Sequence, residues 1–136
     1  MYDHVLVPIA PDHQGRGEAS LAAAEVLLNA NGRMTLLHVT DPIPAYVESY
    51  VPEDIFEKNR EATKADLDDL AAKAKHPANV AMVNGHPARA IVDYAERHDA
   101  DCIVLASHHP GVTDYFLGST AAWVARHADC SIHVIR

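Results

Sequence analysis

Short runs of apolar residues recur along the chain, and between them apolar residues return every three or four positions. The short runs are typical of parallel strands buried on both faces, and the longer spacing is that of amphipathic helices. The predicted strands cover residues 5–9, 34–39, 80–83, 102–105 and 131–135. The clearest helix faces consist of Thr63, Leu67, Leu70 and Ala74, and of Ala88, Ile91, Val92 and Ala95.

Strands that alternate with helices are joined by right-handed crossovers, which place helices on both faces of a parallel sheet. The pattern therefore predicts an α/β protein, with one doubly wound domain over residues 1–136.

Two helix starts are marked by proline. Pro52 and Pro87 are each predicted at the first helical position, where a missing N–H costs nothing.

Turn residues predict two further segments. The first helix is predicted from about Glu18 to Ala30, and it ends at Asn31-Gly32, where glycine can take the left-handed cap conformation. The segment 40–51 is predicted to be irregular, because Pro42 and Pro44 oppose helix there. Its tyrosines could cover a site or form part of an interface.

The composition narrows the class of protein. The chain has 136 residues, 49% of them hydrophobic, a net charge of -8, and scattered Lys and Arg. We therefore expect no nucleic-acid partner, because such proteins present a clustered positive face. No run approaches the ~20 apolar residues that span a bilayer, and the N-terminus has no charged leader, so we expect a cytoplasmic protein without membrane insertion.

Cys102 and Cys130 are expected to be reduced thiols.

Residues 105–120, LASHHPGVTDYFLGST, leave an apolar strand and arrive at a helical segment. In open α/β sheets, ligands bind beyond the carboxyl ends of the strands. Gly118, Ser119 and Thr120 suit a phosphate, because glycine admits a close approach and the first N–H groups of a helix have no partner inside it. The alternative is that Ser119 is only the N-cap of the helix.

Two histidines, His108 and His109, lie in the same segment and raise the possibility of a metal site. The other histidines show no HExxH or comparable spacing, so no metal is predicted and the pair is interpreted as structural or ligand-flanking. A GxxxxGK motif followed by Ser or Thr is absent, and Gly15-Arg16-Gly17 only half matches a dinucleotide fingerprint. No catalytic residue is predicted.

Longer motifs occur in the order HVLVPI, LLHV, GHPARAIVDYAERHDADCIVLASHH and LGSTAAWVARHADCSIHVIR. Together they resemble the universal stress protein family over essentially residues 2–136, and the last motif is the most specific. ASHHP followed by YFLGS is similar to the short F-type branch of that family. The resemblance implies a Rossmann-like fold, with a five-stranded parallel sheet in order 3-2-1-4-5 and helices on both faces.

The resemblance further implies ATP or AMP, with Mg2+ beside the nucleotide, bound across the ends of the first and fourth strands. The residues at the family's contact positions are Pro8, Ile9, Ala10, Val39, Ala106, Ser107, His108, His109, Gly118, Ser119 and Thr120. Three of them depart from the family pattern. Ala10 stands where the family has aspartate, and Ala106 and His109 stand where it has glycine.

The function implied by the resemblance is that of a stress-response sensor or adaptor that binds an adenine nucleotide and acts on an unknown protein partner. A homodimer is expected through the last strand, Ser131 to Arg136, because an uncovered apolar strand edge tends to pair. One alternative is a nucleotide-free homodimeric interaction module with a degenerate site. The other is a slow ATP hydrolase in which His108 or His109 positions water.

Overall fold

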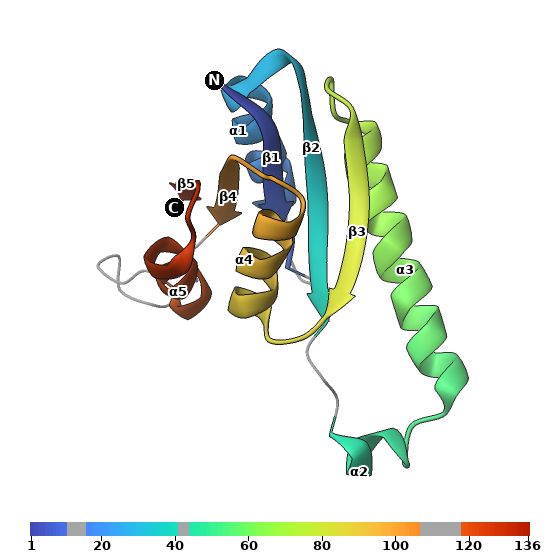
Figure 1. The fold of residues 1–136 in the computed structure, drawn as a ribbon. Helices are drawn as coiled ribbons and strands as arrows, with labels where there is room; N and C mark the ends of the chain where they lie inside the picture. The colour runs from blue at the N-terminus through green and yellow to red at the C-terminus, as the bar shows by residue number, and fades with distance from the viewer. Residues whose placement is uncertain (11–15, 41–43, 107–117) are drawn as a thin grey trace.

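The computed structural model describes residues 1–10, 16–40, 44–106 and 118–136, and a five-stranded parallel sheet forms its centre (Figure 1). The strands are β1 (Tyr2–Pro8), β2 (Leu28–Thr40), β3 (Ala78–Asn84), β4 (Cys102–Ala106) and β5 (Ser131–Ile135). The helices are α1 (Arg16–Leu27), α2 (Ala45–Glu48), α3 (Glu53–Ala72), α4 (Pro87–Arg97) and α5 (Ser119–His127). The strand order is β3-β2-β1-β4-β5, which confirms the predicted α/β fold and strand order.

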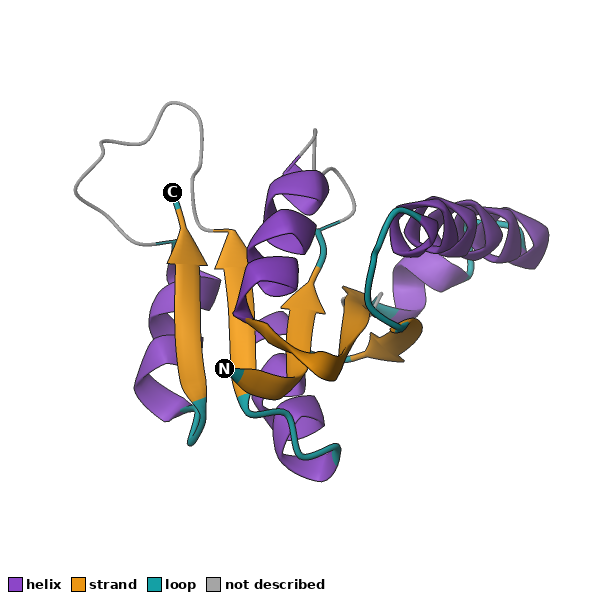
Figure 2. Ribbon diagram, turned by 90° about the horizontal axis from the view of Figure 1, so that it is seen from above, coloured by secondary structure: helices purple, strands orange, loops and turns teal. Residues whose placement is uncertain are grey.

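Each face of the sheet has its own apolar core, because successive side chains of a strand point to opposite faces. On one face, Val5 and Val7 of β1 pack with Leu21 of α1 and Leu67 of α3. On the other face, Leu6 of β1 packs with side chains of α4 and α5, including Ala88, Ile91, Val92, Ala95, Ala121 and Val124. Helices therefore cover both faces, as predicted, and Figure 2 shows how far the strands twist between the two edges of the sheet.

The prolines that mark helix starts behave differently from each other. Pro87 is the first residue of α4, which confirms the prediction for that helix. Pro52 lies one position earlier than predicted, at the N-cap of α3, and Glu53 is the first helical residue. Both places tolerate proline, because neither needs an N–H inside the helix.

The predicted end of the first helix is wrong. Helix α1 ends at Leu27 and the chain enters β2 at Leu28, so Gly32 lies inside a strand and does not cap a helix. A side-chain Cβ at Gly32 would lie 2.8 Å from Cδ2 of Leu28 and 3.1 Å from the carbonyl oxygen of Tyr2. Glycine is therefore favoured here by the close approach of β1 and the start of β2, and not by a left-handed turn.

The segment that follows β2 is also more regular than predicted. Ala45–Glu48 forms the short helix α2, and Pro44 is its N-cap with φ of -55°. Proline disrupts a helix in its interior, where it lacks the N–H and its ring clashes with the preceding turn, so Pro44 can precede a helix as well as break one. Residues 41–43, with Pro42, lie outside the described residues.

Two sequence-based expectations about the whole chain can be compared with the described residues. None of the described helices is long and apolar enough to cross a membrane. Cys102 and Cys130 are free thiols, as predicted, and Cys102 is buried. Burial raises the pKa of Cys102 to about 11, so this thiol stays protonated near neutral pH.

A buried histidine joins the start of β1 to its neighbours. His4 is 4% exposed, and its Nδ1 donates to the carbonyl oxygen of His98 at 3.0 Å. Its Nε2 lies 2.8 Å from the hydroxyl of Thr35 and 3.4 Å from Nη1 of Arg33, and because a guanidinium can only donate, Nε2 accepts. The backbone N–H of His4 donates to the carboxylate of Asp101 at 3.0 Å. This arrangement requires the neutral imidazole, because a carbonyl takes the only ring proton.

The stability of the protein should fall in mild acid because of His4. Burial lowers the pKa of His4 below its ordinary value of 6.5, and the neighbouring Arg33 lowers it further. Because the unfolded chain takes up a proton more readily, the contribution of neutral His4 is complete above about pH 6.5 and is lost as the pH falls through the folded pKa. Urea unfolding measured from pH 7.5 to pH 5 should show a slope that approaches about 1.4 kcal/mol per pH unit from this group.

A matched pair of variants isolates the effect. His4→Gln removes the titrating group and should flatten the slope below pH 6.5, although it lowers stability at every pH. His86→Gln changes an exposed histidine before α4 and should retain the wild-type slope. An unchanged slope in His4→Gln would show that other groups control the acid response.

Candidate functional site

The order of the strands reverses at β1. The chain passes from β1 to β2 and β3 on one side, and it then places β4 and β5 on the other. Open α/β sheets bind ligands at the carboxyl ends of the strands beside such a reversal. Val5 pairs with Cys102 and Leu6 pairs with Ile103, so continuing this register puts Ile9 level with Ala106. The structure therefore brings the predicted residues at the ends of β1 and β4 to one edge of the sheet.

The predicted residues at this edge divide between the two faces of the sheet. Val39 packs with the core under α4 and α5, and Pro8, two positions after Leu6, points to the same side. Ile9 packs with the core under α1 and α3, and Ala106, two positions after Val104, points to that side. Pro8 and Val39 therefore lie on the face that α5 covers.

The backbone of Ile9 is already used within the sheet. Its N–H donates to the carbonyl oxygen of Leu37 at 2.8 Å. Its carbonyl oxygen accepts from Nδ1 of His38 at 3.4 Å, and both side chains are buried, each 5% exposed. Ile9 can thus offer a ligand little beyond apolar surface, whereas Ala10 is exposed and is the last described residue beyond β1.

His38 is not among the site residues that the sequence predicts. The structure places it beside the predicted edge, where it holds the residue after β1 against β2. The only sequence signal was its place next to Val39, near the end of an apolar strand. His38 is a positioning residue at this edge, because its ring nitrogen contacts the backbone.

Helix α5 begins with the Gly-Ser-Thr sequence that predicted a phosphate site. Gly118 is the N-cap, with φ of -56° and ψ of 151°, and its carbonyl oxygen accepts from Ala122 at 2.9 Å. Ser119 is the first helical residue, so the alternative that it caps the helix is wrong. Ser119 is exposed and Thr120 is half-buried. Their backbone N–H groups have no acceptor inside the helix and remain available to an anion.

The middle of the predicted loop, residues 107–117, lies outside the described residues, and with it Ser107, His108 and His109. The assignment of these residues to a nucleotide site, and of either histidine to hydrolysis, stays a prediction. Within residues 1–10, 16–40, 44–106 and 118–136, no three His, Cys, Asp or Glu side chains gather closely enough to hold a metal ion.

A surface pocket of about 470 Å³ lies at the opposite end of the sheet. It is formed where α4 ends and where β4 and β5 begin, and acidic side chains line it, namely Glu96, Asp99, Asp101 and Asp129. Four carboxylates repel a phosphate, so this pocket does not suit a nucleotide. The edge between β1, β4 and α5 is therefore the better candidate for a nucleotide.

Comparisons with known proteins agree with this fold. The model of the universal stress protein family matches residues 1–136, and the chain belongs to this family. A universal stress protein encoded in the QAH/OAS sulfhydrylase 3'region of Thermus aquaticus is 28% identical over 131 residues, which cover 94% of this chain and 96% of the relative. The solved structure of the hypothetical protein MJ0577 has a TM-score of 0.83 and 24% identity, and the match covers 99% of this chain and 96% of that one.

Two further solved structures of similar fold contain nucleotides. One is a universal stress protein in complex with cAMP, with a TM-score of 0.72, 20% identity, and coverage of 99% of this chain and 97% of that one. The other is the universal stress protein from Archaeoglobus fulgidus in complex with dAMP, with a TM-score of 0.67, 18% identity, and coverage of 99% and 98%. The bound cAMP and dAMP are findings about those two proteins.

Proposed function

We propose that this protein binds an adenine nucleotide, ATP or AMP, at the edge formed by the ends of β1 and β4 and the start of α5, and that it acts as a cytoplasmic stress-response sensor or adaptor. The observation that carries the proposal is the start of α5. There, a glycine N-cap and an exposed serine precede N–H groups without helical acceptors, beside the reversal of strand order. The complexes of family neighbours with cAMP and dAMP support an adenine nucleotide.

Each part of the edge has a distinct role in this proposal. The phosphates accept hydrogen bonds from the backbone at Ser119 and Thr120, and Gly118 allows their close approach. Pro8 and Val39, on the face that α5 covers, offer apolar surface to the base. The loop from Ala106 through Ser107, His108 and His109 completes the phosphate side, and a protonated histidine there adds a charge-assisted hydrogen bond.

Ala10 makes a weaker ribose contact than the aspartate that the family carries. Its methyl group accepts no hydrogen bond from a hydroxyl, whereas a carboxylate would accept one or two. The chain also has a net charge of -8, which repels a free nucleotide. Mg2+ bound to the phosphates would reduce this repulsion, so we expect ATP to bind more tightly when Mg2+ is present.

Nucleotide binding should depend on the charge at the start of α5. Ser119→Glu places a carboxylate at the first helical position, which favours the helix but repels phosphate. We expect it to weaken ATP binding at least tenfold, which is about 1.4 kcal/mol, in calorimetric titration with and without Mg2+. Ala125→Glu adds the same charge at an exposed position farther along α5 and should leave the affinity unchanged. Equal affinities for the two variants would exclude α5 as the phosphate site.

A nucleotide-free homodimeric interaction module is the second candidate function, and the exposed Ala10 at the end of β1 favours it. The wild-type protein separates the two candidates. If millimolar ATP and AMP give neither heat nor a thermal shift, the nucleotide proposal fails and the interaction module remains. A copurified adenine nucleotide, identified by mass spectrometry after gentle purification, would instead exclude the empty module.

The proposed homodimer uses the free edge of β5. This strand pairs with β4 on one side, and among the described strands nothing pairs with its other side. Unpaired backbone groups of an edge strand favour pairing with a second chain. An isologous antiparallel pair of Ser131–Ile135 would be centred on His133, which is exposed.

Charge at His133 should therefore disrupt the dimer. His133→Glu sets two carboxylates opposite each other in the antiparallel pair, and like charges placed so are destabilising. Light scattering over a concentration series should show at least tenfold weaker dimerisation than in the wild type. Ala125→Glu again serves as the control of equal charge, and a wild-type protein that is monomeric at every concentration contradicts the proposed edge.

A further inference from the structure

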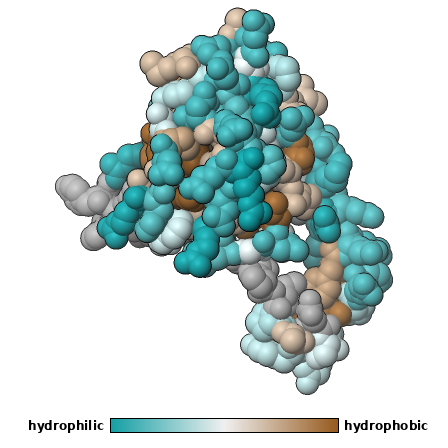
Figure 3. Space-filling model, viewed as in Figure 1, coloured by the Kyte–Doolittle hydropathy of each residue, from teal (hydrophilic) through white to brown (hydrophobic). Residues whose placement is uncertain are grey.

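The segment between β2 and the sheet-covering half of α3 extends beyond the sheet, and we name residues 44–64 the arm. Figure 1 shows α2 and the start of α3 well below the ends of the strands. Three of its large apolar side chains are exposed: Tyr46 at 70%, Tyr50 at 85% and Ile55 at 44%. Figure 3 shows apolar surface where α2 meets α3. The arm thus presents apolar area that the sheet does not cover.

The apolar face of α3 continues into the arm. Leu67 and Leu70 are its buried residues, and both pack on the sheet. Counting back from Leu67 in steps of four and seven leads to Thr63 and Arg60, and a step of eleven leads to Phe56, so these residues share one face of the helix. Phe56 and Thr63 are half-buried, whereas the positions around them are exposed. The first part of α3 therefore has the residue pattern of a helix that packs on an apolar surface, although the sheet of this chain does not extend beside it (Figure 1).

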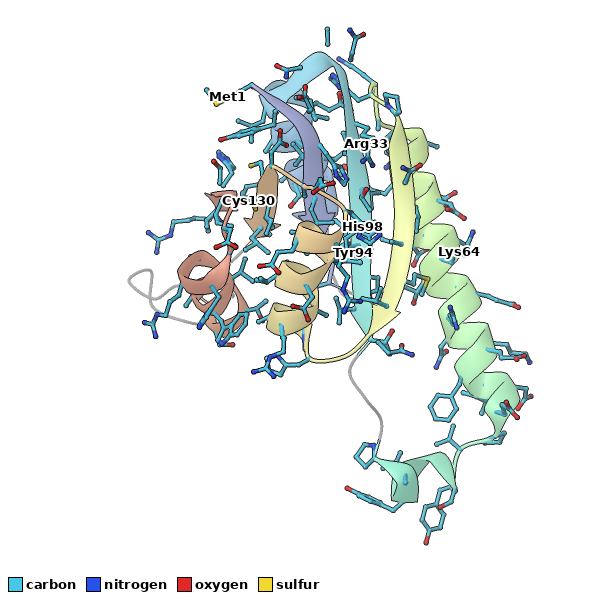
Figure 4. All side chains as sticks on the ribbon, viewed as in Figure 1. Met1, Arg33, Lys64, Tyr94, His98 and Cys130 are labelled. Atoms are coloured by element: carbon cyan, nitrogen blue, oxygen red, sulfur yellow. The ribbon has the colours of Figure 1, made fainter. Side chains whose placement is uncertain are left out.

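A stripe of charge runs beside this face. Glu53, Glu57, Arg60 and Lys64 are spaced by four, three and four residues, which places them in one row. The first two are acidic and the last two are basic. Among the described residues, Glu53, Glu57 and Arg60 form no salt bridge, and Lys64, labelled in Figure 4, pairs with Asp68 at 2.9 Å across an exposed surface. An exposed pair of this kind contributes little to stability, so Lys64 can exchange Asp68 for another carboxylate.

The order of these charges makes the stripe complementary to itself in one direction only. When two copies of α3 lie antiparallel, Glu53 meets the partner's Lys64 and Glu57 meets the partner's Arg60. A two-fold axis then repeats both contacts, as an isologous interface requires. A parallel pair would set acid against acid and base against base. The stripe therefore specifies both the partner, a second copy of this chain, and its direction.

We propose that the arm binds the arm of a second copy of this chain, with the two α3 helices antiparallel and the charge stripes paired. Phe56 lies beside the paired stripes near the middle of the interface, and the tyrosines of α2 cover its ends. This interface is separate from the β5 edge, because α3 packs beside β3 at the other edge of the sheet. A chain that uses both interfaces forms assemblies larger than a dimer.

Charge reversal tests this geometry. Glu57→Arg gives each arm two basic residues at the paired positions, and Arg60→Glu gives each arm two acidic residues, so each variant repels itself. We expect at least tenfold weaker association of either variant in sedimentation equilibrium. An equimolar mixture should regain wild-type association, because Arg against Glu then occurs at both contacts. The double variant E57R/R60E should also associate like the wild type.

The controls separate the arm from the β5 edge and from general charge effects. Asp69→Arg changes the charge by the same amount as Glu57→Arg, on an exposed part of α3 outside the stripe, and should not alter association. His133→Glu should remove one step of assembly and leave the sensitivity to Glu57→Arg. Equal masses for wild type, Glu57→Arg and Arg60→Glu at every concentration would overturn the proposal, as would a mixture that associates no better than its components.

Discussion

Burial of β1 between β2 and β4 is the constraint on which the rest of the structure depends. Val5, Leu6 and Val7 have no exposed surface, so both faces of this strand must be covered. Because their side chains alternate, one face needs α1 and α3 and the other needs α4 and α5. Strands β2 and β4 pair with the two edges of β1, and the resulting reversal of strand order creates the edge where we propose that a ligand binds.

The candidate site combines a part that local chemistry explains with a part that depends on tertiary contacts. The start of α5 is suited to an anion because of its own backbone and Gly118. The β1 side is different, since Ile9 is held by Leu37 and His38 of the neighbouring strand and keeps no free polar backbone group. The base and the phosphates would thus meet surfaces of different character, one apolar and one rich in donors.

The two ends of the sheet have opposite electrostatic character. The acidic pocket at the start of β4 and β5 disfavours anions, whereas the start of α5 at the other end favours them. The arm lies apart from both. Its apolar side chains extend beyond the sheet, so they add little to the stability of a single chain and are exposed to contact with another molecule. In our proposals, ligand binding and assembly use different parts of the fold.

The sequence by itself determined the features that arise from local periodicity. The strands, the buried face of α4 and the proline at its start follow from residue spacing and backbone chemistry, and the structure has each of them at or around the predicted residues, although β2 begins at Leu28, six residues earlier than predicted. Gly32 shows the limit, because a glycine after a helical segment looks the same whether it caps the helix or lets two strands approach. Only the contact with Tyr2 decides between the two. The same holds for His38 and for the arm, since their neighbours are distant in sequence and are brought together, or left uncovered, by the packing of the whole chain.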